Sequence, residues 1–326
     1  MRVFSCGTCD NRLFFENSVC VTCGSALGYW RERGEIVVVD DAGRFVDPEG
    51  FIWHVCVNLN LSGCTWLTRI EGSACEACAL TRVRPADDDP VGLAQLPVAE
   101  SAKRHLLVEL DRLGLSYVPR AADPVGGLCF DMLSSVGENV VIGHADGVIT
   151  IDLAEGDDAH RAKVQSEMAE PYRTMLGHLR HEVGHYMQSL HVTGETLERA
   201  RELFGDETVS YADAIDRHYA EGPPEDWAER HISTYATMHP FEDFAETFAH
   251  VLHIHDTVDT ARWNGLLTVD PEAFSLFGDL VTGVWMPLST ALNQINRSMG
   301  SDDLYPFVIP PPVLAKLDFV DSLRRR

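Results

Sequence analysis

The segment His181-Glu182-Val183-Gly184-His185 constrains the fold most, because on a helix its two histidines can serve one metal ion. Residues four apart lie on one helix face, so His181 and His185 would present two imidazoles to that ion, and Glu182 would reach its bound water. Gly184, costly inside a helix, predicts a close backbone approach. A first-turn proline followed by apolar residues at three- and four-residue spacing supports the helix: Pro171, Tyr172, Met175, Leu176, Leu179, Val183, Met187 and Leu190.

A third ligand is expected downstream, because a catalytic zinc ion usually takes three protein ligands and leaves one position for water. A second predicted helix, beginning near Pro240, carries Glu242 and Glu246 one turn apart beside an apolar stripe. Two carboxylates at this spacing repel each other, so near a core they need positive partners. A zinc ion and the N–H of a ligand imidazole would supply them. The alternative is a solvated acidic face near a helix N-terminus.

The two helices together resemble those of the gluzincins, zincin metallopeptidases whose third zinc ligand is a glutamate on a second helix. The E-x-x-A-E form of residues 242–246 resembles the anthrax lethal factor type. This resemblance implies that Glu242 binds zinc and that Glu246 holds a ligand histidine. It also implies that Tyr235, seven residues before Glu242, stabilises an oxyanion through its hydroxyl. A packed aromatic ring with a hydrated hydroxyl is the alternative for Tyr235.

Nearly the whole chain is similar to a bacterial group of zinc-binding metallopeptidases with an N-terminal zinc-ribbon region. Four stretches carry the similarity: Leu179–Tyr186, Glu221–Trp227, His239–Glu246 and Asn296–Gly300. The resemblance implies a peptidase fold and no particular substrate. We therefore predict an α+β protein, with a mainly helical, zincin-like peptidase domain that contains a small β-sheet and follows a small β-rich zinc-ribbon domain.

Eight of the nine cysteines occur before residue 80, and they divide into two sets of four. The first set, two C-x-x-C pairs ten residues apart, is typical of a structural Cys₄ zinc site, although rubredoxin-like iron is an alternative. The second set predicts another structural zinc site, with cross-bracing between the sets as an alternative. The sets are Cys6, Cys9, Cys20 and Cys23, and Cys56, Cys64, Cys75 and Cys78. We interpret Cys129, which is left over, as a small buried hydrophobe, with a thiol switch as the minor alternative.

These features predict a zinc-ribbon region at 1–85, a linker at 86–98 and a peptidase domain at 99–326, with one catalytic and two structural zinc ions. The N-terminus has no apolar core segment of a signal peptide, and no apolar run approaches the ~20 residues that span a membrane. We therefore expect a cytoplasmic protein without membrane contact, whose thiolates are reduced and available for zinc.

The net charge of −24 disfavours nucleic acid and anionic membranes as partners. The first 85 residues carry 8 basic and 10 acidic residues, so the ribbon region has no basic excess for nucleic-acid binding. We therefore interpret that region as a surface that contacts another protein, with a purely structural role as the next alternative.

A small sheet is predicted before the first metal helix, from runs at 129–133, 139–143 and 147–153. Asp146-Gly147 lies between the last two runs and is a hairpin signal. We expect Gly147–Asp152, or its hairpin partner, to form the sheet edge along a cleft, where an extended peptide could add as a strand. Helices are predicted at 98–113 and 274–292, and Ser210–Asp213 resembles a capping box.

Three further residues are candidates for substrate or transition-state contacts. His231 and His239 are the better histidine candidates for a transition-state donor, because they lie close to Tyr235 and Glu242 in the sequence. Arg297 could hold a substrate carboxylate or carbonyl, and a structural salt bridge is its alternative.

The predicted function is hydrolysis of peptide bonds in a protein or peptide substrate by a zinc-activated water, with Glu182 as general base. One alternative is a non-catalytic, zinc-braced adaptor or regulator that recruits a protein through its ribbon region. Another is a narrow processing peptidase or isopeptidase that acts on one partner protein.

Overall fold

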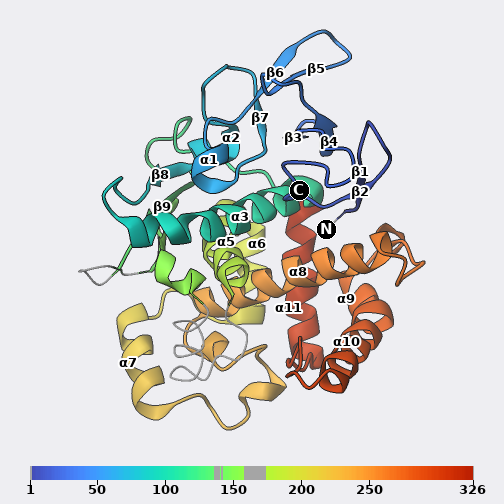
Figure 1. Ribbon diagram of the computed structural model, residues 1–326. Helices are drawn as coiled ribbons and strands as arrows, with labels where there is room; N and C mark the ends of the chain where they lie inside the picture. Colours follow the sequence, from blue (N-terminus) through green and yellow to red (C-terminus); the bar gives the residue numbers. More distant parts are fainter. Residues whose placement is uncertain (1, 136–139, 141, 158–173, 326) are drawn as a thin grey trace. The chain divides into compact units, whose positions relative to one another are not determined.

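The computed structural model describes residues 2–135, 140, 142–157 and 174–325, which form two compact units. The first unit comprises residues 1–112 and 118–162, and the second comprises 113–117 and 163–326. Small sheets in the first unit and helices in the second confirm the predicted α+β class (Figure 1).

Short antiparallel strands build the N-terminal part of the first unit. The β1–β2 pair, the β3–β4 pair and the three-stranded β5–β6–β7 sheet comprise Phe4–Ser5, Arg12–Leu13, Leu27–Trp30, Glu35–Val38, Arg44–Val46, Ile52–Val55 and Leu67–Thr68. Two short helices, α1 (Leu59–Ser62) and α2 (Glu76–Ala79), follow β6 and β7. Trp30, Val39 and Trp53 pack with Leu67 in a buried cluster. The core of this part is therefore small.

A mixed four-stranded sheet completes the strands of the first unit, in the order β10–β11–β9–β8. These strands comprise Gly143–Ala145, Val148–Asp152, Cys129–Leu133 and Thr81–Val83. Asp146 and Gly147 both have left-handed backbones (φ 48° and 79°) and turn the β10–β11 hairpin, as the Asp-Gly signal predicted.

Of the two candidates that we named for the sheet edge, Gly147–Asp152 and its hairpin partner, the described structure places the hairpin partner there, because β11 is paired on both sides. Parallel β9 follows it over the whole of Val148–Asp152, so the edge on this side is its hairpin partner, β10. Residues 136–139 and 141, part of the predicted strand before the hairpin, lie outside the described residues.

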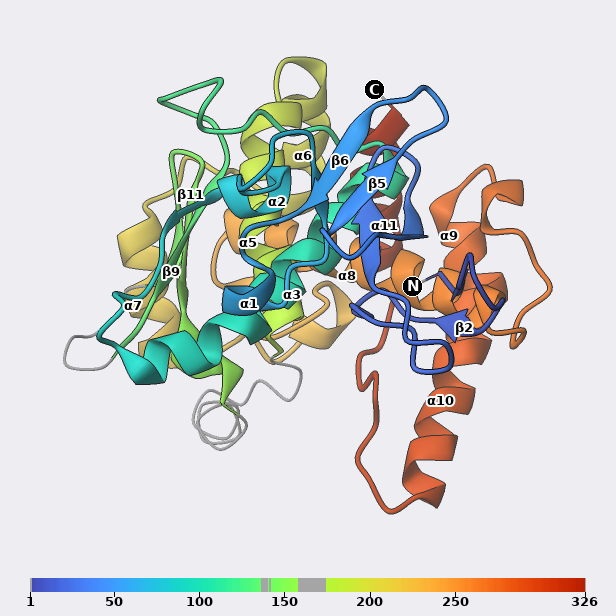
Figure 2. The same ribbon diagram turned by 45° about the horizontal axis from the view of Figure 1, so that its top comes forward.

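The long helix α3 (Pro90–Leu113) begins eight residues earlier than predicted, so residues 90–98, which we expected to be linker, are helical. Asp89 caps its start by accepting a 2.9 Å hydrogen bond from the Gly92 N–H, and Pro90 occupies the first turn. The Lys103 ammonium lies 5.6 Å from the Phe130 ring of β9. Helix α3 therefore packs on the sheet (Figure 2).

Helices form the described part of the second unit, and none of them combines the length and the apolar run that a bilayer crossing requires. The α-helices are α5 (Met175–His191), α6 (Glu195–Phe204), α7 (Tyr211–Glu221), α8 (Pro240–Trp263), α9 (Phe277–Leu280), α10 (Met286–Ser298) and α11 (Pro311–Ser322). The helix predicted at 274–292 begins at Phe277 and contains a π-helical stretch, Val281–Trp285, between α9 and α10. Ser210 caps α7 by accepting from the Asp213 N–H, as its sequence predicted.

Helix α8 is the centre of the second unit, and α5, α6 and α11 pack against it (Figure 1). The contact with α5 is closest at Gly184. A Cβ atom at Gly184 would lie 3.0 Å from the Ala245 Cα and 3.2 Å from the Phe248 Cβ. The interior glycine therefore lets two helix backbones approach each other, as its position in the sequence predicted.

We predict that Gly184→Ala lowers the free energy of unfolding, although alanine alone favours a helix by about 1 kcal/mol. The added methyl group would push α5 from α8, and such overpacking costs roughly 1–3 kcal/mol. Chemical denaturation measures the change. Gly283→Ala is the matched control, because its Cβ would have no neighbour closer than 3.9 Å. Equal stability of Gly184→Ala and the wild type would contradict the prediction.

Candidate functional site

Helix α5 presents the first two candidate ligands from one face. Thr174 caps the helix by accepting from the Gly177 N–H at 3.0 Å, and Pro171, expected in the first turn, lies outside the described residues. His181 and His185 follow one turn apart, with their ring centroids 4.9 Å from each other. The two imidazoles can therefore face a common point.

Helix α8 brings Glu242 to the same point from its first turn. The Glu242 Oε2 lies 3.0 Å from the His181 Nε2 and 3.5 Å from the His185 Nε2. These three donor atoms lie within 4.8 Å of one another, and Glu242 and His181 are buried. The structure thus brings together the three residues predicted to hold the catalytic metal.

The three donor atoms fit a zinc ion. Donor atoms that lie 2.0–2.2 Å from zinc in a tetrahedral site are about 3.4 Å from one another. The distances from the Glu242 Oε2 to the two histidine nitrogens, 3.0 and 3.5 Å, are close to this value. Imidazole and carboxylate suit zinc, and three protein ligands leave one position for water. Glu182, whose Oε1 lies 3.2 Å from the His178 Nε2, has a buried Oε2 without a hydrogen-bond partner in the described structure. A water at the open position would satisfy that oxygen.

The charges of the site also favour a cation. Burial alone would raise the pKa of Glu242, but hydrogen bonds from His181 and His185 hold it well below its usual value. Burial would likewise raise the pKa of Glu182, but the hydrogen bond from His178 and the nearby histidines lower it. Both carboxylates are therefore ionised at neutral pH, in a buried site that gains from a divalent cation.

Glu246 orients His181 from behind. Its Oε1 accepts from the His181 Nδ1 at 2.7 Å, and its Oε2 accepts from the Ser233 hydroxyl at 2.6 Å. With the Nδ1 proton engaged, the Nε2 of His181 is available to a metal. Glu246 thus lies where the resemblance to gluzincins placed it, and Ser233 is a supporting residue that sequence reasoning missed.

Two tyrosines lie beside the three donor atoms. The ring of Tyr235, in a short 3₁₀ turn (Tyr235–Thr237), is 5.8 Å from the His181 ring. Tyr211 donates a 2.8 Å hydrogen bond to the Glu242 Oε1. Burial and the Glu242 charge raise the pKa of each hydroxyl, so both remain donors at neutral pH. Sequence reasoning missed Tyr211, because its only signal was membership of the α7 capping box.

Both ring nitrogens of His239 have structural partners. Its Nδ1 accepts from the Phe241 N–H at 3.1 Å and so caps α8, which leaves the proton on Nε2. That Nε2 donates to the Val209 carbonyl at 3.2 Å. In the structure His239 therefore caps α8, and its role as a transition-state donor stays a prediction.

His231 and Arg297 also have other partners. The His231 Nε2 lies 3.7 Å from the Asp243 Oδ2, which pairs with Lys316 at 2.5 Å, so His231 belongs to this buried cluster. Burial, with the charge of Lys316, lowers the pKa of His231 to about 4. Arg297 forms two 2.6 Å hydrogen bonds to Asp303 on an exposed surface, which is the salt-bridge alternative.

The first cysteine quartet consists of two knuckles with matching backbones. The Cys6 carbonyl accepts from the Asp10 N–H and the Cys20 carbonyl from the Gly24 N–H, and both donor residues have left-handed backbones (φ 56° and 75°). The closest sulfur pairs, Cys6 with Cys23 and Cys9 with Cys20, lie 3.7 and 3.6 Å apart. In a tetrahedral site with zinc–sulfur bonds of 2.3 Å, neighbouring sulfur atoms lie about 3.8 Å apart. A disulfide would need about 2.05 Å.

The second quartet is wholly buried and has the same spacing. The Cys56 and Cys78 sulfurs lie 3.7 Å apart, and those of Cys64 and Cys75 lie 3.5 Å apart. Its cysteines group with one another, as those of the first quartet do, so the described structure offers no cross-bracing between the sets. Cys129 is buried in β9 outside both quartets.

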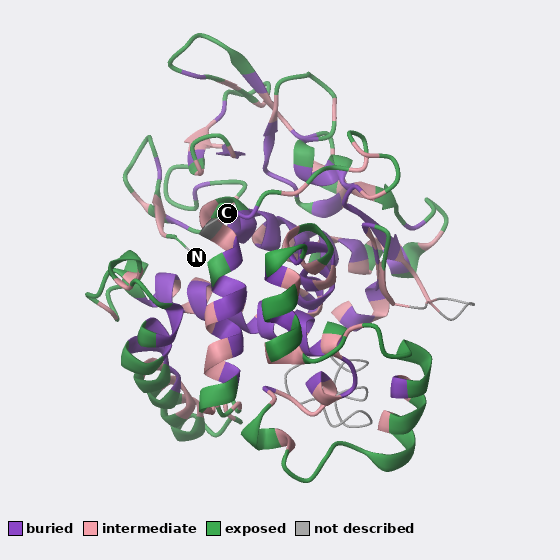
Figure 3. Cartoon of the chain, turned by 180° about the vertical axis from the view of Figure 1, so that it is seen from behind, coloured by how far each residue is buried: buried purple, intermediate pink, exposed green. Residues whose placement is uncertain are grey.

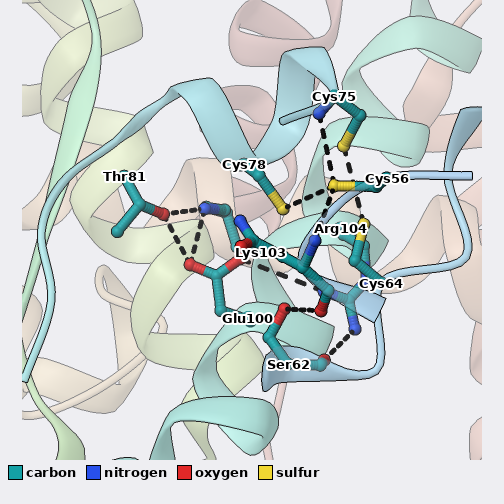
Figure 4. Close-up of polar contacts among 10 residues, drawn as sticks. Cys56, Ser62, Cys64, Cys75, Cys78, Thr81, Glu100, Lys103 and Arg104 are labelled. Carbon is teal, nitrogen blue, oxygen red and sulfur yellow. Dashed lines mark hydrogen bonds and ion pairs between the residues drawn. The ribbon is translucent and has the colours of Figure 1, made fainter. Parts of the chain in front are cut away.

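Helix α3 places basic side chains beside the second quartet (Figure 4). Arg104 donates to the Ser62 carbonyl of α1 at 3.1 Å, and Lys103 pairs with Glu100 at 2.8 Å. Both cations contact the buried Glu100 carboxylate, at 2.8 and 3.9 Å, which offsets one of their two charges.

The donor set on two packed helices, with two cysteine quartets, is characteristic of zinc-binding proteins. The chain belongs to the family described as "putative zinc-binding metallo-peptidase", which residues 93–323 match. Residues 3–89 match a zinc-ribbon domain. Uncharacterized proteins of Mycobacterium bovis and of two Mycobacterium tuberculosis strains are 48% identical to the chain, over 99% of it and 95% of each relative. No solved structure matches it.

We predict that Cys56→Ala removes one zinc ion per chain and lowers the thermal unfolding temperature. Loss of one thiolate opens a closed Cys₄ site, whose metal binding contributes directly to folding. Elemental analysis and thermal unfolding measure the two effects. Cys129→Ala is the matched control, because Cys129 is buried but belongs to neither quartet. Equal zinc contents in the two variants would argue against a metal at the second quartet.

Proposed function

We propose that this protein is a zinc-dependent peptidase whose catalytic metal is held by His181, His185 and Glu242. The main support is the convergence of their three donor atoms within 4.8 Å, next to the buried, unpartnered Oε2 of Glu182. Family membership supports the same class of activity. Two further zinc ions would occupy the cysteine quartets and brace the ribbon region.

When bound, zinc would lower the pKa of its water to about 7 and polarise the substrate carbonyl. Glu182 takes the proton of the attacking water on its open Oε2, while His178 holds its Oε1 at 3.2 Å. The same carboxyl group then passes that proton to the leaving amine, as a general acid. Its location directly beside His181 on α5 gives it access to the open ligand position.

Tyr235 would stabilise the oxyanion of the tetrahedral intermediate. Its ring lies beside His181, and its raised pKa keeps the hydroxyl protonated as a hydrogen-bond donor. Glu246 fixes the tautomer of His181 through the 2.7 Å contact. The Tyr235 hydroxyl would stabilise charge that develops only during the reaction, which is the condition for a faster chemical step.

We further propose a protein or peptide substrate, and a protein partner for the ribbon region, whose 8 basic and 10 acidic residues give it no cationic excess for nucleic acid. We also propose a reducing compartment such as the cytoplasm, where the thiolates of both quartets would stay available for zinc. The adaptor alternative requires no open metal position, whereas the helical site offers three protein ligands and a base.

Metal content tests the helical site first. We predict about three zinc ions per chain in the wild type, one for each cluster, and two in the His181→Ala/His185→Ala variant, because that variant loses two of three ligands. Elemental analysis of both proteins measures this. If both hold two zinc ions, and added zinc also fails to bind the wild type, the adaptor alternative replaces the peptidase.

Glu182→Gln tests the chemistry separately. We predict that this variant keeps its zinc and that its rate of hydrolysis falls by about 10²–10⁴-fold, because glutamine cannot accept the proton. Cleavage of peptide libraries or of proteins captured by the inactive variant provides the assay. Glu195→Gln on α6 is the control, because it changes the same group away from the three donor atoms.

Full activity of Glu182→Gln at wild-type zinc content would refute the mechanism. Tyr235→Phe belongs in the same assay, with lower turnover and unchanged zinc content expected. Unaltered turnover would remove Tyr235 from the oxyanion role.

A further inference from the structure

Glu242 has two carboxylate oxygens with different surroundings. Its Oε2 faces the two ligand imidazoles, at 3.0 and 3.5 Å. Its Oε1 accepts the 2.8 Å hydrogen bond from Tyr211. Glu242 is 2% exposed, so the described structure gives Oε1 a protein partner where water has little access. One oxygen is thus directed to the metal position and the other is held by a neutral donor.

A carboxylate can bind a metal ion through one oxygen or through both. If the Glu242 Oε1 turned toward zinc as well, it would add a fifth ligand and crowd the position that a hydrolytic site keeps for water. The tyrosine hydroxyl competes for this oxygen. A tyrosine hydroxyl is protonated at neutral pH, so Tyr211 can donate to this oxygen, as its 2.8 Å contact shows.

Contacts at the N-terminal end of α7, rather than contacts along the helix, hold Tyr211 in place. Ala214 is the buried residue of α7, and the helix is otherwise largely exposed (Figure 3). The preceding residues are anchored, however, because His239 donates to the Val209 carbonyl at 3.2 Å while it caps α8. The ring of Tyr211 also packs against that of His239, with centroids 5.1 Å apart. His239 therefore joins the starts of α7 and α8, three residues before Glu242.

We propose that Tyr211 is a positioning residue that keeps Glu242 bound to zinc through Oε2 alone and so leaves the fourth ligand position open. This inference rests on the proposed function, because it assigns a role toward the same metal. It gives His239 a second task, which is to hold Tyr211 in reach of the Glu242 Oε1. Tyr211 itself takes no part in proton transfer.

Tyr211→Phe tests the proposal in the full-length protein, with Tyr219→Phe as the matched control. Tyr219 lies on the same helix, is 66% exposed, and its ring contacts that of His218. We expect Tyr211→Phe to weaken zinc binding at the helical site by about 10–100-fold, as loss of a hydrogen-bond partner of a ligand typically does. Competition with a chelator that leaves the cysteine quartets loaded measures the affinity. Tyr219→Phe should bind zinc as the wild type does.

Cobalt provides a reading of coordination that does not depend on activity. Co²⁺ is added to protein stripped only of the zinc in the helical site, and its visible absorption is recorded. Tetrahedral cobalt absorbs more strongly than five-coordinate cobalt, so a weaker band in Tyr211→Phe than in the wild type is expected. The metal-depleted Tyr211→Phe protein should unfold at a lower temperature, because the buried Glu242 Oε1 loses its hydrogen bond, whereas metal-depleted Tyr219→Phe should unfold as the wild type does.

Two results would overturn the inference while leaving the peptidase proposal intact. One is wild-type zinc affinity and an unchanged cobalt spectrum in Tyr211→Phe, in a protein whose His181→Ala/His185→Ala variant does lose one zinc. The other is an equal loss of affinity in Tyr211→Phe and Tyr219→Phe with metal-free stability lowered in both, which would assign the effect to α7 packing. Absence of a third zinc from the wild type would overturn both proposals.

Discussion

The close packing of α5 against α8 sets the distances among the candidate ligands. At Gly184 the two backbones approach until a Cβ atom would lie 3.0 Å from the Ala245 Cα. Gly184 lies between the two ligand histidines, and Ala245 lies between Glu242 and Glu246. The same contact therefore brings His181 within 3.0 Å of one carboxylate and within 2.7 Å of the other. A larger residue at either position would change both distances together.

Burial of charge is the second constraint on the helical unit. Lys316 of α11 pairs with Asp243 of α8 at 2.5 Å, and Arg180 of α5 lies 3.5 Å from Asp256. Each pair neutralises a carboxylate that burial would otherwise destabilise. Around the candidate metal position the same need is met by histidines, tyrosines and a serine. These residues balance only part of the negative charge of the buried carboxylates, and a divalent cation would balance the rest.

The sequence predicted the parts of the site that depend on spacing along one element. Histidines four apart on a helix, a glutamate in the first turn of another, and C-x-x-C knuckles all have local geometry that a sequence displays. Tyr211 and Ser233 were missed, because their contacts with Glu242 and Glu246 come from the start of α7 and from an irregular segment, which lie between α5 and α8 in the sequence. The contacts of His239 could not be predicted for the same reason, since the partner of its Nε2 is the Val209 carbonyl, far away in the sequence. Asp89-Pro90 was interpreted as linker although an N-cap aspartate and a first-turn proline also begin helices.

His181 lies between two carboxylates, and this placement couples metal uptake to acidity. Burial alone would lower its pKa, but hydrogen bonds to Glu242 and Glu246 raise it well above the ordinary histidine value. Before metal binds, the imidazole therefore carries a proton that stabilises the fold below the unfolded pKa, and this stabilisation is lost as pH rises through the folded value. If zinc binds as we propose, it must displace that proton, so below the folded pKa each unit of acidification would weaken uptake by about tenfold. The proton on His181 would then serve as a provisional cation, and zinc would enter by exchange for it.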